Sequence, residues 1–342
     1  MITLNEEYNS LIESNRFDEE EYFIKQKVDL GFTQIFLGVD KNENKSIMFS
    51  FNTPLAKSDM DRLPKWNGLS ISNRKLVNKN NNKEEWFLIF SEEKINHALK
   101  INVFIYLVED ILEDIQKNKN SHLMLNYLKI TLSKWEHFFA INNSKPLSDI
   151  QLQGVYGEMQ FLKKLLENSA VEQQLLILDG WDGLKRSKRD YKFGENLFEV
   201  KTTRKDKPYS VSISSEEQLF IVEDKQVYLC CYMLLVDNQL GTDLKTLIFE
   251  VENILMSHNR TIFRDKLFQA GLMIDMLEDQ ELEKYIVQDN LNYKVEKEFP
   301  ILNKNNIPKE VFNVKYSITL DGLENYLVDI EEIVKDVKNN LS

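Results

Sequence analysis

The chain is predicted to adopt an α/β fold, and three features of its sequence indicate this. A helical pattern that opens at Leu147–Ser148 is followed by short apolar runs with strand-like spacing. A second helix can begin at Ser214 or Ser215, and the apolar run Val227–Val236 after it has the length of a buried strand. The expected order is helix, three strands, helix, strand, which is typical of an α/β core.

The first hundred residues favour strands, and the segment after them favours helices. Short apolar runs at Gln34–Val39, Ile47–Phe51 and Trp86–Phe90 are separated by polar segments, as in hairpins. From about Ile95 apolar residues recur at helix-face intervals. The loop composition of residues 142–146 ends this region and marks a predicted domain boundary.

The predicted core occupies residues 146–237, between a β-rich region with a helical extension over residues 1–145 and an α+β extension over residues 238–342. Its first helix has Ser148 as N-cap and runs to Leu166. Strand candidates follow at Leu175–Leu178, Asp190–Phe193, Leu197–Thr202 and Tyr209–Ile213. In the last extension we expect helices near Leu244–Leu255 and Thr261–Leu267, a strand near Tyr293–Glu298 and a final helix from Gly322.

Composition limits the class of protein. The 342 residues suit two domains, and the ordinary apolar fraction argues against global disorder. No apolar run approaches the ~20 residues that span a bilayer, and the first residues lack the pattern of a signal peptide. The adjacent Cys230 and Cys231 are expected to point to opposite faces of a strand as small core residues. We therefore expect a cytoplasmic protein.

One acid-x-Lys triplet stands out from seven in the chain. Alternation along Leu197–Thr202 places Glu199 and Lys201 on one strand face and apolar side chains on the other. A turn upstream folds back the strand that opens at Asp190, so a hairpin can bring the two carboxylates close enough to share a metal. Magnesium prefers oxygen ligands and needs only one or two carboxylates, and a lysine beside it can orient water.

The helix upstream carries two glycines. Gly154 and Gly157 each cost roughly 1 kcal/mol against alanine in a helix, which suggests close packing on the sheet or close approach of a ligand. Glu158 follows the second glycine. It could reach the same site from the helix.

These motifs together resemble the PD-(D/E)XK nuclease superfamily. Gly154-x-x-Gly157-Glu158, Asp190 and Glu199-x-Lys201 occur in the expected order, and the likeness is sharpest from Leu147 to Leu219. Within the superfamily, the chain is similar to PD-(D/E)XK-motif proteins of prokaryotic restriction and phage-defence gene clusters. Features shared outside the three motifs are Trp135, Leu147-Ser148, Gly180-Trp181-x-Gly183, Ser214-Ser215-x-x-Gln218-Leu219 and Phe299-Pro300. Arg189 stands where the superfamily name has proline.

The resemblance implies a restriction-endonuclease-like core and a metal-dependent endonuclease that hydrolyses DNA. It implies that Asp190 and Glu199 bind Mg²⁺ or Mn²⁺, that Lys201 is catalytic, and that Glu158 assists as a further catalytic or metal-binding group. Expected partners are DNA, ATPase or methyltransferase subunits of a defence operon, and a second copy in a homodimer, with no membrane. The alternatives are a non-cutting nuclease-fold subunit that binds nucleic acid or a partner ATPase, and a nuclease that acts on RNA.

Local charge supports a polyanionic substrate although the chain has a formal net charge of −12. From Lys185 to Lys207 nine basic and four acidic residues give a net charge of +5, which suits a phosphate backbone. The basic residues are Lys185, Arg186, Lys188, Arg189, Lys192, Lys201, Arg204, Lys205 and Lys207. Gln218 has two readings, a contact to site water or phosphate and a cap of the following helix, and Trp181 is interpreted as a packing residue. The four histidines lack zinc spacing.

Overall fold

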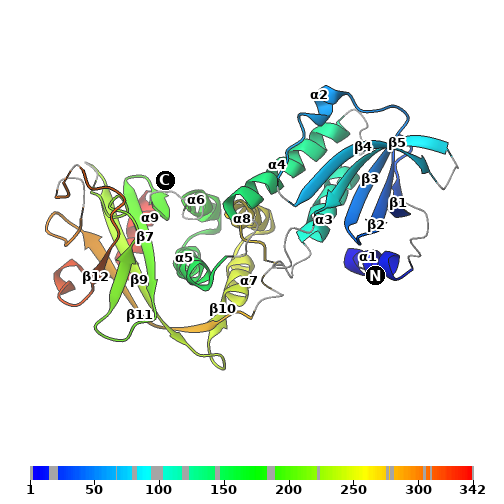
Figure 1. Ribbon diagram of the computed structural model, residues 1–342. Helices are drawn as coiled ribbons and strands as arrows, with labels where there is room; N and C mark the ends of the chain where they lie inside the picture. Colours follow the sequence, from blue (N-terminus) through cyan, green and yellow to red (C-terminus); the bar gives the residue numbers. More distant parts are fainter. Residues whose placement is uncertain are drawn as a thin grey trace. The chain divides into compact units, whose positions relative to one another are not determined.

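The computed structural model describes residues 3–14, 22–66, 68–78, 83–93, 103–117, 123–142, 147–182, 189–221, 224–274, 277, 281–302, 306–308 and 310–340. The chain forms two compact units, Met1–Pro146 and Leu147–Ser342 (Figure 1). Residues 238–342 therefore share a unit with residues 147–237. The expected helix start near Ile95 lies outside the described residues.

The first unit contains a five-stranded antiparallel sheet in the order β1-β2-β3-β5-β4. Its strands are β1 (Tyr22–Asp29), β2 (Gln34–Asp40), β3 (Lys45–Phe51), β4 (Leu69–Asn78) and β5 (Lys83–Glu92). Its helices are α1 (Leu4–Glu13), the short α2 (Lys57–Met60), α3 (Val103–Lys117) and α4 (Met124–Asn142). The three apolar runs of the sequence are confirmed as β2, β3 and β5, whereas α1, β1 and β4 were not predicted.

The second unit is built around a mixed sheet in the order β10-β11-β9-β7-β6. Strands β7 and β9 pair in parallel, and β11 and β6 run antiparallel to their neighbours. The strands are β6 (Tyr191–Phe193), β7 (Asn196–Thr203), β9 (Gln226–Val236), β10 (Thr242–Asp243) and β11 (Lys284–Val295). The short strands β8 (Ser210–Ile213) and β12 (Tyr316–Thr319) form a separate two-stranded ribbon.

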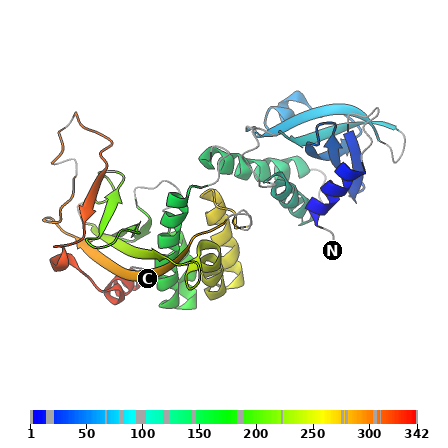
Figure 2. The same cartoon turned by 60° about the horizontal axis from the view of Figure 1, so that its bottom comes forward.

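Helices and the ribbon cover opposite faces of this sheet. The face that includes Phe198 and Cys230 packs in one apolar cluster with α5 (Asp149–Glu167), α6 (Gln174–Asp179) and α7 (Leu244–Ile254). The helices α8 (Ser257–Gln269) and α9 (Ile330–Asn339) belong to the same cluster, and Figure 2 shows α5 and α7 side by side. The other face, with Leu197 and Cys231, packs against the apolar side of the β8–β12 ribbon. Both free cysteines are buried, on opposite faces as expected.

The predicted order of the core is wrong in three places. Leu175–Leu178 is part of helix α6, in which Gln174, Ile177 and Leu178 are buried at helix-face spacing while Leu175 and Leu176 are exposed. The strand candidate Tyr209–Ile213 is β8, which among the described residues pairs with β12 alone and lies outside the main sheet. The helix expected at Ser214 or Ser215 is absent from the described residues 214–221, which form a turn with a Gln218 N–H bond to the Ser215 carbonyl.

The C-terminal elements differ from expectation in their bounds. Strand β11 begins at Lys284, about nine residues before the predicted start, because the whole edge of β9 is available to pair with it. The last helix, α9, begins at Ile330, after a turn at Gly322 and a 3₁₀ turn at Glu324–Tyr326. Among the described residues, no helix is long and apolar enough to cross a membrane.

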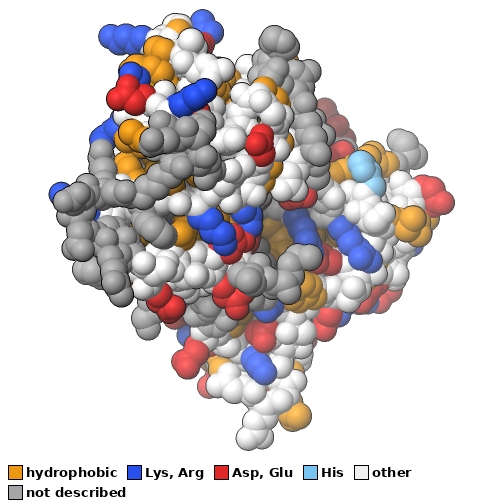
Figure 3. All heavy atoms as spheres, turned by 90° about the vertical axis from the view of Figure 1, so that its right-hand side faces the viewer, with side chains coloured by type: hydrophobic (Ala, Val, Ile, Leu, Met, Phe, Trp, Pro, Cys, Tyr) orange, Lys and Arg blue, Asp and Glu red, His pale blue; other side chains and the backbone are white. Residues whose placement is uncertain are grey.

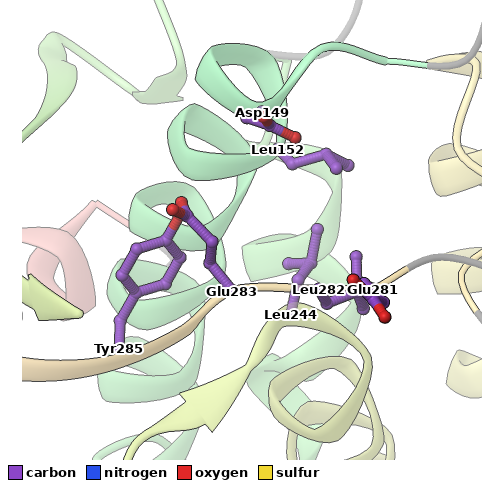
Figure 4. A pocket seen from close by; sticks show the side chains of 7 residues that line it. All are labelled: Asp149, Leu152, Leu244, Glu281, Leu282, Glu283 and Tyr285. Carbon is purple, nitrogen blue, oxygen red and sulfur yellow. The ribbon is translucent and has the colours of Figure 1, made fainter. Parts of the chain in front are cut away.

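A small cavity lies where the first turns of α5 and α7 meet the start of β11 (Figure 4). Its lining includes the carboxylates of Asp149, Glu281 and Glu283 beside apolar Leu152 and Leu244. Its volume is about 20 Å³, which is enough for one water molecule. This cavity is too small for a substrate.

The two glycines of α5 have different surroundings. A Cβ atom at Gly157 would overlap the Thr202 Cγ2 methyl on β7, whereas a Cβ at Gly154 would meet nothing within 4 Å. Thr202 is held in place because its Oγ1 accepts a hydrogen bond from Gln153 Nε2 at 3.0 Å. Of the two explanations predicted, close packing on the sheet holds for Gly157, whereas Gly154 has open space and borders a cleft.

This difference gives a matched pair of substitutions. Gly157→Ala should lower the free energy of unfolding by about 1–3 kcal/mol, because the β-branched Thr202 cannot yield without leaving its rotamer. Gly154→Ala should raise it by up to about 1 kcal/mol, since alanine is the better helix former and has room. Urea unfolding of both variants measures the two effects, and equal shifts in the midpoint would contradict this account of α5 packing.

Candidate active site

The β6–β7 hairpin places Asp190 at the edge of the sheet. Gly194 forms its turn with a φ of 56°, a left-handed conformation that suits glycine. The ladder ends where the Asp190 N–H bonds to the Phe198 carbonyl at 3.1 Å. Beyond that point the Asp190 side chain replaces a main-chain acceptor, because its Oδ2 accepts the Val200 N–H at 2.7 Å. The carboxylate therefore satisfies a strand edge that β6 is too short to cover.

Strand β7 separates its apolar and charged side chains by alternation, as the sequence predicts. Phe198 and Val200 belong to the apolar cluster under α5. On the other face, Lys201 Nζ donates to Glu199 Oε1 at 2.6 Å, and Glu199 is 0% exposed. Glu199 Oε2 is buried and has no hydrogen-bond partner among the described residues. A buried carboxylate oxygen without a donor is costly, so this atom points to a missing ligand.

Glu158 approaches the same region from helix α5. Its Oε2 accepts a 2.8 Å hydrogen bond from Trp181 Nε1, and its main-chain carbonyl accepts one from the Tyr191 hydroxyl at 2.7 Å. Trp181 is buried and stacks on Tyr191, which confirms its reading as a packing residue and adds a polar contact that the sequence did not indicate. These bonds fix Glu158 beside the hairpin that carries Asp190.

Burial raises the pKa values of all three carboxyl groups, and repulsion from Asp190 adds to the shift for Glu158 and Glu199. Burial raises the pKa of Glu199 to about 8, and the charge of Asp190 adds to this effect while Lys201 opposes it. Burial likewise raises the pKa of Asp190 and, together with the Asp190 charge, raises that of Glu158 well above its ordinary value. The pKa of Lys201 is raised because its acidic neighbours outweigh burial, so its ammonium stays charged. If all three carboxyl groups were ionised, their negative charge would exceed the charge that Lys201 offsets.

A cleft of about 710 Å³ brings these residues together at one surface. Glu158, Asp190, Glu199, Lys201 and Gln218 all line it. Figure 3 shows one face of the molecule, on which basic and acidic side chains are interspersed without a continuous patch of either sign among the described residues. The cleft therefore combines a group of carboxylates with the cations of Lys201, Arg204 and Lys205 at one surface.

The donor set fits a hard divalent cation held mainly by two carboxylates. Such an ion takes oxygen ligands and keeps several waters, so Asp190 and Glu199 suffice. The partnerless Glu199 Oε2 provides one ligand atom, and a cation there would offset the excess negative charge. Within the described part of the chain, no three Asp, Glu, His or Cys side chains form a three-ligand metal group. A direct role of Glu158 as third ligand therefore gains no support from its position.

A family comparison agrees with this geometry. The family model described as "Putative PD-(D/E)XK family member, (DUF4420)" matches residues 4–321. The chain belongs to this PD-(D/E)XK family. No match was found among curated proteins or among solved structures. Family membership suggests a nuclease, and PD-(D/E)XK nucleases generally use divalent metals.

The basic segment from Lys185 to Lys207 lies beside the candidate site, and only part of it is available to a substrate. Lys185, Arg186 and Lys188, with Gly183, lie outside the described residues. Arg189 is buried, and its guanidinium donates to the carbonyls of Glu217 and Phe220. Its expected contribution to a phosphate-binding rim is therefore wrong, because it ties the hairpin to the turn after β8. Arg204 and Lys205 border the cleft, and Lys192 and Lys207 are exposed.

Gln218 and the serines around it were the part of the site that sequence reasoning left open. Gln218 Oε1 accepts from both Ser214 N and Ser214 Oγ, at 2.8 and 3.0 Å. It therefore closes a single turn, in the manner of a cap, while also lining the cleft. The cleft serines Ser210 and Ser212 were not predicted, although alternation along β8 could have indicated them.

The raised pKa of Glu199 predicts a pH-dependent cost in stability. The folded pKa of about 8 lies above the ordinary value near 4.3, so stability is full below about pH 4 and falls as pH rises toward 8. In chelator, wild type should lose on the order of 2–5 kcal/mol relative to Glu199→Gln between about pH 5 and 8.

Divalent metal provides the second arm of this experiment. At pH 8, adding magnesium should raise the melting temperature of wild type, since the ion binds the folded carboxylates, and should do little to Glu199→Gln. Calorimetry of both proteins with magnesium and with chelator measures this difference. Identical pH profiles and identical metal responses would rule out a charge-strained metal site at Glu199.

Proposed function

We propose that the chain is a magnesium-dependent endonuclease that hydrolyses phosphodiester bonds of DNA within a restriction or phage-defence system. The observation that carries the proposal is the buried Glu199–Lys201 pair, beside Asp190, with one carboxylate oxygen unpartnered among the described residues. Structural burial alone gives no reason for that arrangement, because an ion pair with an unsatisfied oxygen destabilises a core. Hydrolysis of a phosphodiester would use the two carboxylates, the lysine and the unpartnered oxygen.

Each residue has a role that follows from its position. Asp190 and Glu199 would hold the ion, which supplies charge at the phosphoryl oxygen and a lower pKa for water. Lys201 orients the attacking water and offsets negative charge at phosphorus. Water oxygen bonds to phosphorus and its proton passes to solvent, while one P–O bond to a sugar breaks and the departing alkoxide takes up a proton from a solvent water. The cleft can hold a length of phosphate backbone over this centre.

The rival function is a nuclease-fold subunit that binds nucleic acid or a partner ATPase without cutting. Such a subunit would need the fold and the cleft but not the unpartnered carboxylate. The two functions predict different effects of a single lysine substitution, which leaves binding surfaces almost unchanged.

Lys201→Ala should abolish cleavage while folding and DNA binding stay nearly intact. The lysine acts on water and on charge that develops in the transition state, and groups of this kind contribute ~10²–10⁴-fold to the rate. Lys192→Ala is the matched control, since Lys192 is exposed on the adjacent strand and its neighbours Tyr191 and Phe193 are buried. Nicking of supercoiled plasmid in magnesium and in chelator measures both variants.

The outcomes separate the two functions. Cleavage by Lys201→Ala at the wild-type rate would refute the mechanism. Wild-type protein that binds DNA or an ATPase but does not cut, with partner subunits supplied, would establish the non-cutting subunit. Glu199→Ala should also stop cleavage, and excess magnesium should partly restore it because weaker ion binding is offset by mass action.

A second substitution tests the part played by Glu158. Trp181→Phe removes the Nε1–H that donates to Glu158 Oε2 and preserves the aromatic packing. If Glu158 acts through an ordered carboxyl group, kcat should fall roughly 2- to 10-fold, which corresponds to the loss of one hydrogen bond. Glu158→Gln should give a comparable or larger loss. Unchanged kcat in both variants would remove Glu158 from the site.

A further inference from the structure

The ribbon formed by β8 and β12 has one apolar face and one face of hydroxyl groups. Val211, Ile213 and Ile318 are buried against the main sheet. The alternate positions of the ribbon are exposed or partly exposed and carry only hydroxyl side chains, namely Ser210, Ser212, Ser317 and Thr319. Facing partners are in register across the ribbon, Ser212 opposite Ser317 and Ser210 opposite Thr319. This outer face carries no carboxylate.

The hydroxyl face borders the catalytic cleft. Ser210, Ser212 and Ser214 line the same cleft as Glu199 and Lys201. Both the ribbon and the Glu199 side chain lie on the β7 face that is opposite to α5. Glu199 is fully buried and its Oε2 has no partner among the described residues, which independently marks this cleft as a site for a ligand.

The side chains that line the cleft indicate which part of a nucleic acid it can bind. Proteins that hold single strands stack unpaired bases on aromatic side chains. The described lining of this cleft has no aromatic residue and consists mainly of hydroxyl, amide, ammonium and carboxylate groups. Hydroxyl and ammonium groups donate hydrogen bonds to phosphate oxygens, the contacts that position a duplex without reading its bases.

We propose that the hydroxyl face of the β8–β12 ribbon binds the sugar–phosphate backbone of a DNA duplex and guides it into the cleft. The proposal rests on the proposed nuclease function and adds the substrate form and the subsite. Serine hydroxyls approach phosphates without repulsion in an acidic chain, and Lys205, whose Nζ donates to Ser210 Oγ at 3.1 Å, supplies adjacent positive charge. Because these hydroxyls would contact the backbone and not the bases, binding at this face should not depend on the base sequence.

Charge substitution at one exposed hydroxyl tests the surface. Ser212→Asp should weaken binding of a fluorescent duplex at least tenfold, because a carboxylate would face phosphate, whereas Ser212→Lys should strengthen it. Ser257→Asp is the matched control, since Ser257 is exposed in the same unit at the start of α8 and does not line the cleft. Binding is measured in the Lys201→Ala background with magnesium, and cleavage in the background of native Lys201.

Salt dependence distinguishes hydroxyl contacts from folding defects. The double variant Ser212→Ala and Ser317→Ala should weaken duplex binding roughly tenfold, for two lost hydrogen bonds, with the slope of log K against log salt unchanged. Lys205→Ala should reduce that slope by about 0.9, because one phosphate contact no longer releases a counterion. A slope that changes in the double serine variant would overturn the assignment of neutral contacts.

The results separate this proposal from the function on which it rests. Cleavage of duplex by wild type, with Ser212→Asp cutting equally well, overturns the ribbon subsite and leaves the nuclease. Preferential binding and cutting of a single strand of the same sequence overturns the duplex form. Duplex binding that Ser212→Asp abolishes, in a protein that never cuts, supports the ribbon and refutes the nuclease.

Discussion

The buried pair of Glu199 and Lys201 is the constraint around which the second unit is arranged. A carboxylate at 0% exposure requires donors and cover on every side. Lys201 provides the donor, the β8–β12 ribbon covers the sheet face, and Asp190 ends the neighbouring strand so that this edge of β7 stays open. The length of β6 therefore matters for the site, since a longer β6 would pair with the edge of β7 that borders the cleft.

The site was predictable from sequence because it depends on local periodicity. Two-residue alternation puts Glu199 and Lys201 on one face of a strand whatever the fold around it, and a glycine turn returns Asp190 to the same end. Trp181 was harder to assign. Its hydrogen bond to Glu158 joins residues 23 positions apart and follows from packing, which has no signature in spacing.

The elements that were predicted incorrectly were those whose form depends on distant partners. The run Leu175–Leu178 is too short for its periodicity to distinguish a strand from a helix. In the folded chain it forms part of helix α6, in which Ile177 and Leu178 are buried and the other two residues of the run are exposed. Strand β8 looks like a core strand in sequence, yet its partner β12 lies about a hundred residues away. Arg189 looked like a surface cation, although its guanidinium bonds to carbonyls in a turn that only the folded chain brings near.

The pairing of β9 with β11 limits how far this protein can be shortened without exposing an apolar strand edge. Strand β9 is almost entirely apolar, and β11 covers one side of it from Val227 to Val236. A fragment that stopped at Asp237 would keep all four candidate catalytic residues and expose that side as a long, uncharged edge strand. Such edges recruit strands from other chains. An excised catalytic segment would therefore aggregate, although every residue required for chemistry was present.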